Sequence, residues 1–372
     1  MTKVLVTGSR GFIGRNLIEH LNALEGMTVL RHDVVNSRQE LYASLAEADA
    51  IVHLAGVNRP DDLLEFEAGN IGLTHDICAQ LISMGKKTPL IFSSSVQAEL
   101  ANPYGASKKR AEEEVAAYAA ATGAAVAIYR LPNVFGKFCR PDYNSVVATF
   151  CDRLTHEREI TMNDPGSRVS LVYIDDVVEE FLRALAGHAT RHGAFCGVPA
   201  EDVHIVTLGR LEELLRSFAR SRTDLTLPDL GDPLVRKLWA TWQSYLPADG
   251  LSYPLPTRAD ARGSFTEFLR TPDRGQLSVN VAKPGVCKGN HWHHTKTEKF
   301  LVVSGRGVIR FRRLGDGAVQ EYLVSGDQLE VVDVPPSYIH NIENLGSADL
   351  VTVMWASEAF DPARPDTRPE KV

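Results

Sequence analysis

The sequence has no long apolar run and no paired cysteines, and each absence excludes a class of protein. None of its apolar segments approaches the roughly 18 residues of a membrane-spanning helix. The N-terminus carries a short strand pattern in place of the long apolar core of a signal peptide. The five cysteines are scattered and form no Cys-x-x-Cys pair, which is typical of reduced thiols. We therefore expect a cytoplasmic protein with no membrane partner.

A basic excess is also missing. The net charge of −7 provides no electropositive footprint for nucleic acid, and the one basic cluster, 108–110, lies in a helical pattern. We therefore expect no nucleic-acid partner. A chain of 372 residues, 44% apolar and 23% charged, is typical of a globular protein and too long for one ordinary core. Because the pattern loosens between residues 225 and 253, we predict two domains, 1–245 and 246–372.

A histidine-rich stretch near the C-terminus predicts a metal site. His291 and His293 are two residues apart, so both project to one face of a strand. Glu298 returns on the same or the next strand, and His340 supplies a third imidazole. Three nitrogens and one carboxylate oxygen suit a divalent first-row metal with an open position for water or substrate.

The spacing of this stretch resembles the first cupin motif. Gly285, five residues, the His-Trp-His run, four residues, Glu298, six residues and Gly305 match that motif at every position. The resemblance implies an all-β cupin (jelly-roll) domain with a metal site. The alternative is an aromatic-rich core strand without a ligand.

At the other end of the chain, a glycine-rich turn joins a short apolar strand, 3–7, to a helical pattern. Backbone amides in such a turn can approach a pyrophosphate, and the helix N-terminus adds partial positive charge. The alternative is a tight turn without a ligand. The residues that we predict to contact a dinucleotide are Gly8, Gly11, Phe12, Ile13 and Gly14.

Further strand patterns at 28–31, 50–56 and 89–92 alternate with helical patterns. This alternation predicts an α/β, Rossmann-like, doubly wound parallel sheet with its ligand at the carboxyl ends of the strands. The third strand ends in small residues, as is typical beneath a dinucleotide, and the predicted contacts there are Leu54, Ala55 and Gly56.

The end of the second strand bears on the choice of cofactor. Arg31 suits the 2′-phosphate of NADP, whereas Asp33 suits the 2′-hydroxyl of NAD. The arginine favours NADP(H) over NAD.

Ser95, Tyr104 and Lys108 carry the chemistry of this half. Tyr104 and Lys108 are four apart in a helical run, so both face the same way, and Ser95 ends the preceding strand. We predict that the ammonium lowers the tyrosine pKa, so that the phenol passes a proton to or from a substrate oxygen. With the glycine turn, these residues resemble the extended short-chain dehydrogenases/reductases that act on nucleotide sugars. The resemblance implies that all three are catalytic and that Tyr104 and Lys108 also contact the cofactor; the alternative is a surface pair.

Two later residues resemble positions of the same family. Asn133, in the run Arg130–Gly136, matches an asparagine that touches the sugar nucleotide; organising a turn is the alternative. Asp175 also looks like the family, and we predict that it caps a helix.

The run Asp260–Glu267 resembles the entry arm of epimerases that act on nucleotide-linked 4-keto-6-deoxy sugars. The resemblance implies that Arg262 grips the nucleotide and places Lys288 and His291 at the catalytic position. The lone pair of His291 can serve only once, as a metal ligand or as a base. Lys288, His294 and a hydroxide on the metal therefore remain alternatives for moving the proton.

Across its whole length the sequence resembles the bifunctional capsular-polysaccharide enzymes of the UDP-2-acetamido-2,6-dideoxy-β-L-talose synthase type. The resemblance implies C3 epimerisation of a UDP-linked 4-keto-2-acetamido-2,6-dideoxyhexose in a zinc cupin. NADPH-dependent reduction at C4 follows, on the route to UDP-N-acetyl-L-fucosamine, in a homodimer. Three alternatives stay open: a cupin that only binds sugar or dimerises, an N-terminal half that only senses nicotinamide, and a cupin oxygenase.

Overall fold

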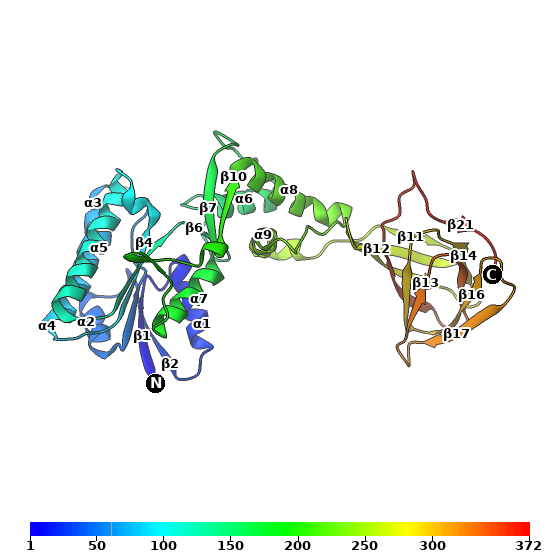
Figure 1. Cartoon of the computed structure of the whole chain (residues 1–372), viewed down its shortest axis with the longest axis horizontal. Coiled ribbons are helices and arrows are strands. Elements are labelled where there is room, and N and C mark those ends of the chain that lie inside the picture. Colours follow the sequence, from blue (N-terminus) through cyan, green and yellow to red (C-terminus); the bar gives the residue numbers. More distant parts are fainter. Residues whose placement is uncertain (61) are drawn as a thin grey trace. The chain divides into compact units, whose positions relative to one another are not determined.

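The structure, a computed structural model, describes residues 1–60 and 62–372 (Figure 1). The chain forms two compact units, the first of residues 1–216 and 233–247 and the second of residues 217–232 and 248–372. Of the helices described, none has the length and apolar character needed to cross a bilayer. The predicted domain boundary between residues 245 and 246 stays a prediction.

The first unit is built on a seven-stranded sheet of order β2-β1-β3-β4-β5-β9-β8. Its pairs are parallel except for the last, β8 with β9. The direction of the strand order changes between β1 and β3, and a doubly wound sheet forms its ligand crevice at such a point. The strands are β1 (Thr2–Thr7), β2 (Met27–His32), β3 (Ala50–His53), β4 (Leu90–Ser95), β5 (Val126–Leu131), β8 (Arg191–His192) and β9 (Phe195–Cys196).

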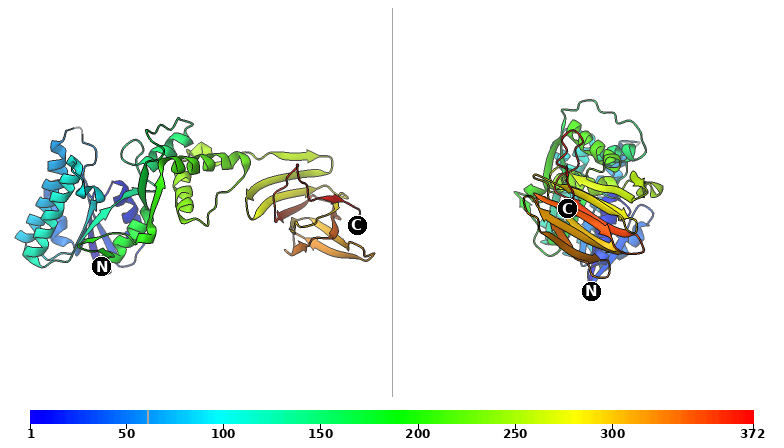
Figure 2. Two further views of the ribbon diagram at one scale, coloured as in Figure 1. Left: turned by 45° about the horizontal axis from the view of Figure 1, so that its top comes forward. Right: turned by 90° about the vertical axis from the view of Figure 1, so that its right-hand side faces the viewer.

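Helices cover both faces of this sheet (Figures 1 and 2). Along β1 the side chains alternate: Val4 and Val6 are buried against α1 and α7, and Leu5 is buried against α2, α4 and α5. The helices are α1 (Phe12–Asn22), α2 (Arg38–Glu47), α3 (Leu64–Phe66), α4 (Leu73–Ser83), α5 (Pro103–Thr122) and α7 (Ile174–Leu185).

The part of the first unit that follows β5 in the sequence contains a small sheet of order β10-β7-β6. The prediction that Asp175 caps a helix is wrong, because α7 begins at Ile174 and its N-cap is Tyr173. Asp175 lies in the first turn, where both carboxylate oxygens accept from Lys137 Nζ (2.6 and 2.9 Å). The remaining elements here are β6 (Asn133–Phe135), α6 (Val146–Thr155), β7 (Arg168–Tyr173), β10 (Val203–Thr207), α8 (Leu208–Asp224) and α9 (Pro233–Gln243).

The second unit consists of two antiparallel sheets in two layers (Figure 2). Their orders are β11-β12-β13-β20-β15-β18 and β17-β16-β19-β14-β21. Buried apolar side chains from both sheets, such as Phe300 and Ile309, form its core. The strands are β11 (Thr257–Asp260), β12 (Gly263–Thr271), β13 (Gly275–Ala282), β14 (Cys287–Trp292), β15 (Glu298–Ser304), β16 (Arg306–Arg313), β17 (Val319–Ser325), β18 (Val331–Val334), β19 (Tyr338–Asn344), β20 (Leu350–Ala356) and β21 (Arg368–Pro369).

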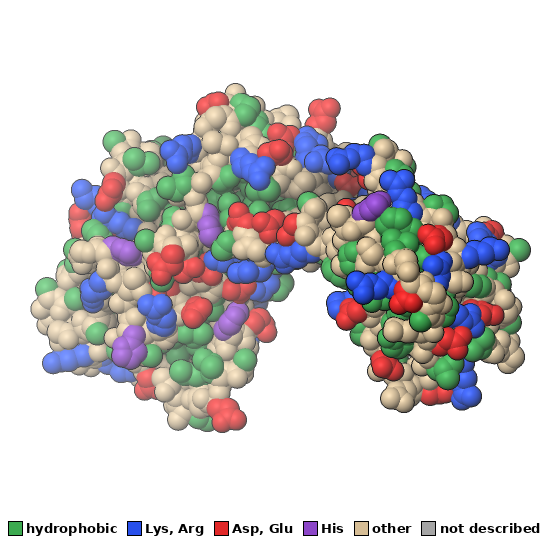
Figure 3. Space-filling model, turned by 45° about the vertical axis from the view of Figure 1, so that its right-hand side comes forward, with side chains coloured by type: hydrophobic (Ala, Val, Ile, Leu, Met, Phe, Trp, Pro, Cys, Tyr) green, Lys and Arg blue, Asp and Glu red, His purple; other side chains and the backbone are tan. Residues whose placement is uncertain are grey.

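The predicted fold class is confirmed: a doubly wound α/β unit precedes an all-β unit of two facing sheets. On the face shown in Figure 3, acidic and basic side chains are interspersed.

Candidate functional site

The four predicted metal ligands come together in the second unit. β14 and β19 pair with His291 opposite His340, Glu298 begins β15, and His293 lies just after β14. One ligand atom from each side chain lies within 4.8 Å of the others. The fold therefore gathers residues that lie up to 49 positions apart in the sequence.

The inward-facing atoms of this cluster fit a metal ion. The Nδ1 of His293 donates to the backbone carbonyl of Asp366, and the Nδ1 of His340 donates to that of Tyr338 (3.1 Å). Each ring therefore presents the lone pair of Nε2 inward. Those two Nε2 atoms and Glu298 Oε2 are buried without a hydrogen-bond partner among the described residues. Buried polar atoms are normally paired, and a bound cation would satisfy all three.

The protonation states of the cluster also suit a metal. Burial and the neighbouring His340 lower the pKa of His291 to about 4, so its imidazole is neutral at pH 7. Burial alone raises the pKa of Glu298, but the ring nitrogens of His293 and His340, whose Nε2 atoms lie 3.5 and 3.2 Å from Oε2, outweigh burial and lower that pKa well below its usual range. Neutral imidazoles and an ionised carboxylate are the forms that bind a divalent cation.

A cavity of about 760 Å³ adjoins the cluster. His291, Glu298 and His340 line it, as do Lys288 and Lys296. This volume is typical of a site for a ligand of several rings. Lys296 was not predicted, and its Nζ lies 3.6 Å from Glu298 Oε1. Its position two residues before Glu298 is the sequence signal that identifies it.

Lys288 reaches the cavity because β14 is irregular. The register of β14 with β19 shifts between Gly289 and His291. The Nζ of Lys288 donates to Val281 O (2.7 Å) and to Asn280 Oδ1 (3.0 Å). Burial lowers the pKa of Lys288. Because these acceptors hold its protons, the Lys288 ammonium is better suited to stabilise negative charge on a ligand than to act as a base.

Two other predicted participants lie away from the cavity. His294 is exposed and is not among the residues that line it. Arg262, in the turn between β11 and β12, pairs with Asp260 (2.7 Å) and is also absent from the lining. Among the described residues, the arginines that do line the cavity are Arg258 and Arg270.

In the first unit, the glycine-rich turn closes tightly over the end of β3. Gly8 has a φ of +65°, and a Cβ there would lie 2.8 Å from Ala55 N. The hydroxyl of Thr7 accepts from the N–H groups of Leu54 and Ala55, both at 3.2 Å. Position 8 therefore requires glycine. The N-cap of α1 is Gly11, which has no side chain to cap the first N–H groups and leaves them available to an anion.

The other predicted residues of this turn have packing roles as well. A Cβ on Gly14 would clash with Gly8 O, and Phe12 and Ile13 pack against the core at the start of α1. The turn and the end of β3 thus form one close-packed surface at the carboxyl ends of the strands.

Ser95, Tyr104 and Lys108 lie together beside this surface. Ser95 ends β4, and its hydroxyl is close enough to influence the Tyr104 phenol through a hydrogen bond. Lys108, one turn further along α5, is buried and donates to the Ser93 carbonyl (2.8 Å). A Cβ on Gly56 would lie 3.3 Å from Lys108 Nζ, so the lysine reaches the end of the third strand.

The charge states of this group differ from the prediction that Lys108 lowers the pKa of Tyr104. Burial raises the pKa of Tyr104 to about 12, although Ser95 opposes this. Burial lowers the pKa of Lys108 to about 8, although Glu112 opposes this. The prediction is wrong because it left out burial. A neutral phenol is the form that donates a proton, so the site suits reduction.

Asn70 adjoins these residues and was not predicted. It lies on a π-helical turn, Glu67–Gly72, and its amide exchanges hydrogen bonds with the backbone of Val57 (2.7 and 3.1 Å). It also donates to Ser107 Oγ (2.8 Å). Asn70 therefore ties the loop after β3 to α5. No sequence pattern marks a π-helical turn, although such turns are frequent at functional sites.

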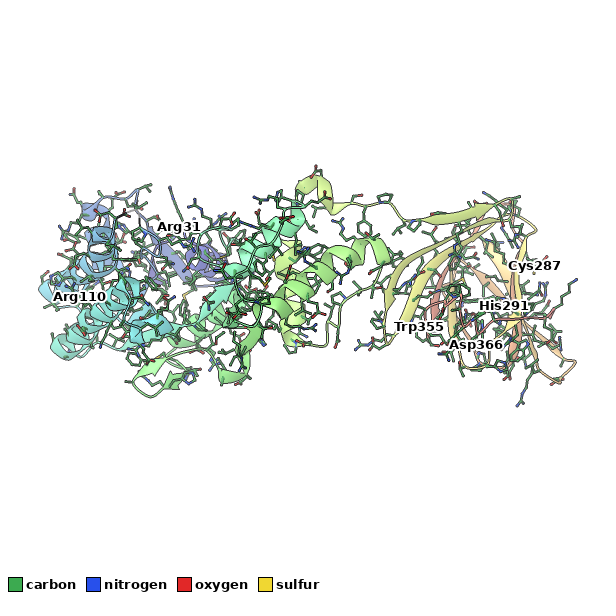
Figure 4. All side chains as sticks on the ribbon, turned by 90° about the horizontal axis from the view of Figure 1, so that it is seen from above. Arg31, Arg110, Cys287, His291, Trp355 and Asp366 are labelled. Atoms are coloured by element: carbon green, nitrogen blue, oxygen red, sulfur yellow. The ribbon has the colours of Figure 1, made fainter. Side chains whose placement is uncertain are left out.

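A second cavity, of about 400 Å³, lies at the end of β2, where Arg31 is labelled in Figure 4. Arg10, Arg15 and Arg31 line it, and the Arg15 guanidinium lies 4.7 Å from the centre of the Phe138 ring. Asp33 accepts from the Arg10 N–H (2.7 Å). Glu19 is the acidic residue of the lining, so three arginines outnumber one carboxylate and favour an anionic ligand such as a phosphate.

Asn133 lies on β6, where its Nδ2 donates to the carbonyl of Ser170 on β7 (3.2 Å). This bond organises the strand pair, and the role of Asn133 towards a substrate stays a prediction.

The two units define the class of protein: an extended short-chain dehydrogenase/reductase joined to a cupin. The chain belongs to the NAD dependent epimerase/dehydratase family, which residues 4–194 match. Residues 258–368 match the polysaccharide biosynthesis C-terminal domain.

Relatives share this organisation. The chain is 43% identical, over 98% of its length and 97% of the relative's, to the UDP-2-acetamido-2,6-beta-L-arabino-hexul-4-ose reductase of Pseudomonas aeruginosa. The crystal structure of the capsular polysaccharide assembling protein CapF from Staphylococcus aureus has 49% identity and a TM-score of 0.94, with 99% of this chain and 100% of that chain covered. UDP-glucuronic acid 4-epimerase from Bacillus cereus, in complex with NAD, has 17% identity and a TM-score of 0.55 over 66% of this chain and 98% of its own, and so shares the fold.

Proposed function

We propose that this chain is a bifunctional nucleotide-sugar enzyme. The second unit epimerises C3 of a UDP-4-keto-2-acetamido-2,6-dideoxyhexose, and the first unit then reduces the C4 ketone with NADPH. The product is UDP-2-acetamido-2,6-dideoxy-L-talose, on the route to UDP-N-acetyl-L-fucosamine. The observation that carries the proposal is the full-length similarity, 43% identity over 98% of the chain, to a hexul-4-ose reductase. The ligand cluster of the second unit, and the group of Ser95, Tyr104 and Lys108 in the first, support two steps. We also propose a cytoplasmic homodimer.

The chemistry requires this order of steps. A ketone at C4 acidifies the hydrogen on C3, because the carbanion delocalises onto the carbonyl oxygen as an enolate. Once C4 is an alcohol, that hydrogen is no longer acidic. Epimerisation therefore precedes reduction.

In the second unit, the proposed ligands are His291, His293, Glu298 and His340, and zinc is the metal that suits them. The ion, when bound, would polarise the C4 carbonyl and acidify the neighbouring C3–H. The ammonium of Lys288 adds positive charge in the same cavity, where the enolate oxygen would develop. His291 acts either as a metal ligand or as the base, because a lone pair that binds the metal cannot also accept a proton.

In the first unit, Tyr104 donates a proton to the C4 oxygen, and a bound nicotinamide cofactor would supply the hydride to C4. Ser95 hydrogen-bonds the same oxygen, and Lys108, through its bond to the Ser93 carbonyl, holds α5 against β4 at the site. The raised pKa of Tyr104, about 12, keeps its proton available at neutral pH. The proposed cofactor contacts are Gly8, Gly11, Phe12, Ile13, Gly14, Arg31, Leu54, Ala55, Gly56, Tyr104 and Lys108.

The wild-type protein tests the proposal directly. Incubated with the UDP-linked 4-keto sugar in deuterated buffer without NADPH, it should incorporate deuterium at C3, as seen by NMR. Adding NADPH should then consume the cofactor in proportion to the sugar. Cofactor oxidation without deuterium at C3 would favour a cupin that only binds sugar.

Replacing Arg31 with alanine should weaken the use of NADPH selectively. Loss of a charge-assisted contact to the 2′-phosphate, about 1.5–3 kcal/mol, should raise the KM for NADPH by about 10-fold or more while the KM for NADH changes little. Initial rates with each cofactor measure the effect. Arg38→Ala is the matched control, because Arg38 lies on α2 and pairs with Asp76. An equal loss with both cofactors would contradict a 2′-phosphate site.

A further inference from the structure

The C-terminal tail, residues 357–372, lies against the metal-ligand cluster. Its short strand β21 pairs with β14, so that Pro369 is opposite His291 and Arg368 is opposite Trp292. Figure 4 labels His291 and Asp366, a tail residue, in this unit. One edge of the strand that carries the first ligand is therefore covered by the tail.

Other bonds hold the tail at its two ends. The N–H of Phe360 donates to Gln276 Oε1 (3.0 Å), beside the cavity. Beyond β21, the N–H of Glu370 donates to Asn290 O (3.0 Å), and Arg312 donates to Glu370 Oε1 (2.9 Å). The tail is thus anchored on both sides of the cluster.

Asp366 makes the densest set of contacts in the tail. Its carboxylate accepts from the backbone N–H groups of His294 (2.9 Å), Thr295 (2.9 Å) and Lys296 (3.1 Å). It also accepts from the Thr295 hydroxyl (3.2 Å). Its backbone carbonyl accepts from Nδ1 of His293. A single residue therefore fixes the orientation of one proposed ligand and the loop that leads to the next.

The same segment contributes to the wall of the cavity, through Phe360, Pro362 and Thr367. Displacing the tail would therefore both open the cavity and release the loop that follows His293.

We propose that residues 357–372 form a strap that positions the metal ligands, with Asp366 as its positioning residue. A partner on the outer nitrogen of a ligating histidine sets its tautomer and ring orientation, and losing such a partner typically costs about 10–100-fold in metal affinity. Because the strap and the ion act on the same loop, each stabilises the other, and the coupling is reciprocal. The inference rests on the metal site of the proposed function.

The first test compares two aspartates of the tail in the full-length protein. Asp366→Ala keeps the backbone carbonyl that accepts from His293 and removes the carboxylate that holds the 294–296 loop. Zinc should therefore bind about 10-fold more weakly than to the wild type, the lower end of losses from indirect contacts, measured by competition with a chromophoric chelator. Asp361→Ala is the matched control, because the Asp361 carboxylate accepts from Ala363 N–H within the tail (2.9 Å). It should bind zinc like the wild type. Asp366→Asn, which keeps one side-chain acceptor oxygen for the 294–296 loop, should fall between them and replaces the alanine variant if that variant does not fold.

The second test uses the wild-type chain alone. Hydrogen exchange of residues 357–372 should be slow with zinc bound and faster after a chelator removes it. A wild type that binds no zinc overturns the metal site itself. If the Asp366 variants bind zinc with wild-type affinity, or if hydrogen exchange in the tail is the same with and without the chelator, the strap proposal is wrong while the metal site remains supported.

Discussion

Tyr104→Phe should abolish NADPH oxidation and leave deuterium uptake at C3 intact. The phenol is the proposed proton donor to the C4 oxygen, and general acid catalysis contributes about 10²–10⁴-fold to a rate. The variant keeps the aromatic ring, which lies 5.9 Å from the ring of Phe66 between centroids, so its packing is preserved. Single-turnover absorbance of NADPH measures the loss of reduction, and NMR of the sugar measures the C3 exchange that is retained.

Tyr118→Phe is the matched control on the same helix. Tyr118 is fully buried in α5, and its hydroxyl donates to the carbonyl of Thr88 (2.9 Å). Losing this bond should cost about 1 kcal/mol of stability and leave the rate of NADPH oxidation unchanged. If Tyr104→Phe retained a tenth or more of the wild-type rate, or lost C3 exchange as well, the assignment of the tyrosine would be wrong.

Glu298→Gln should have the opposite profile, with C3 exchange lost and reduction retained. The substitution preserves size and removes the only negative charge of the four-residue cluster, so zinc affinity should fall by more than about 100-fold, the upper end of losses from indirect contacts. Zinc binding by competition and deuterium uptake by NMR measure the loss. Reduction of a sugar already epimerised at C3 should proceed normally.

His294→Ala is the control for this substitution, because His294 is exposed and belongs to neither the cluster nor the cavity lining. It should keep both zinc and exchange. Mixing Glu298→Gln with Tyr104→Phe provides a stricter comparison: each variant keeps one step, so the mixture should form the final product from the 4-keto sugar. A mixture without product would contradict two independent sites.

His291→Ala separates the two roles open to that residue. Loss of zinc together with exchange would identify a ligand, whereas loss of exchange with zinc retained would identify the base.

The sequence was sufficient where the signal is local. The glycine turn, the alternating strands and the Tyr104–Lys108 spacing each depend on residues within one or two turns of chain, and backbone geometry translates such spacing directly into position. The metal cluster was also found, since His291, His293 and Glu298 lie within eight positions. His340 was proposed as the third imidazole, but no local spacing placed it there, because only the pairing of β14 with β19 brings it near.

What the sequence did not reveal depends on contacts between distant segments. Asp366 lies 73 positions from His293, in a Pro-rich tail with no periodic pattern. Asn70 depends on a π-helical turn, and the pKa of Tyr104 depends on burial by surroundings that only the folded chain provides. Charge and solvent exposure at a site are properties of the tertiary structure, and residue spacing does not encode them.

The register shift in β14 has a geometric consequence for how this half of the molecule tolerates change. In a regular strand, positions 288 and 291 differ by an odd number and point to opposite faces. Asn290, with φ of +59°, is the inserted residue of a bulge, and it places positions 288 and 291 on the same face. A lysine and an imidazole can therefore share one cavity from a single strand. Deleting Asn290 would make either Lys288 or His291 point to the opposite face of the sheet. A single-residue deletion here should therefore disrupt the site more than most substitutions do.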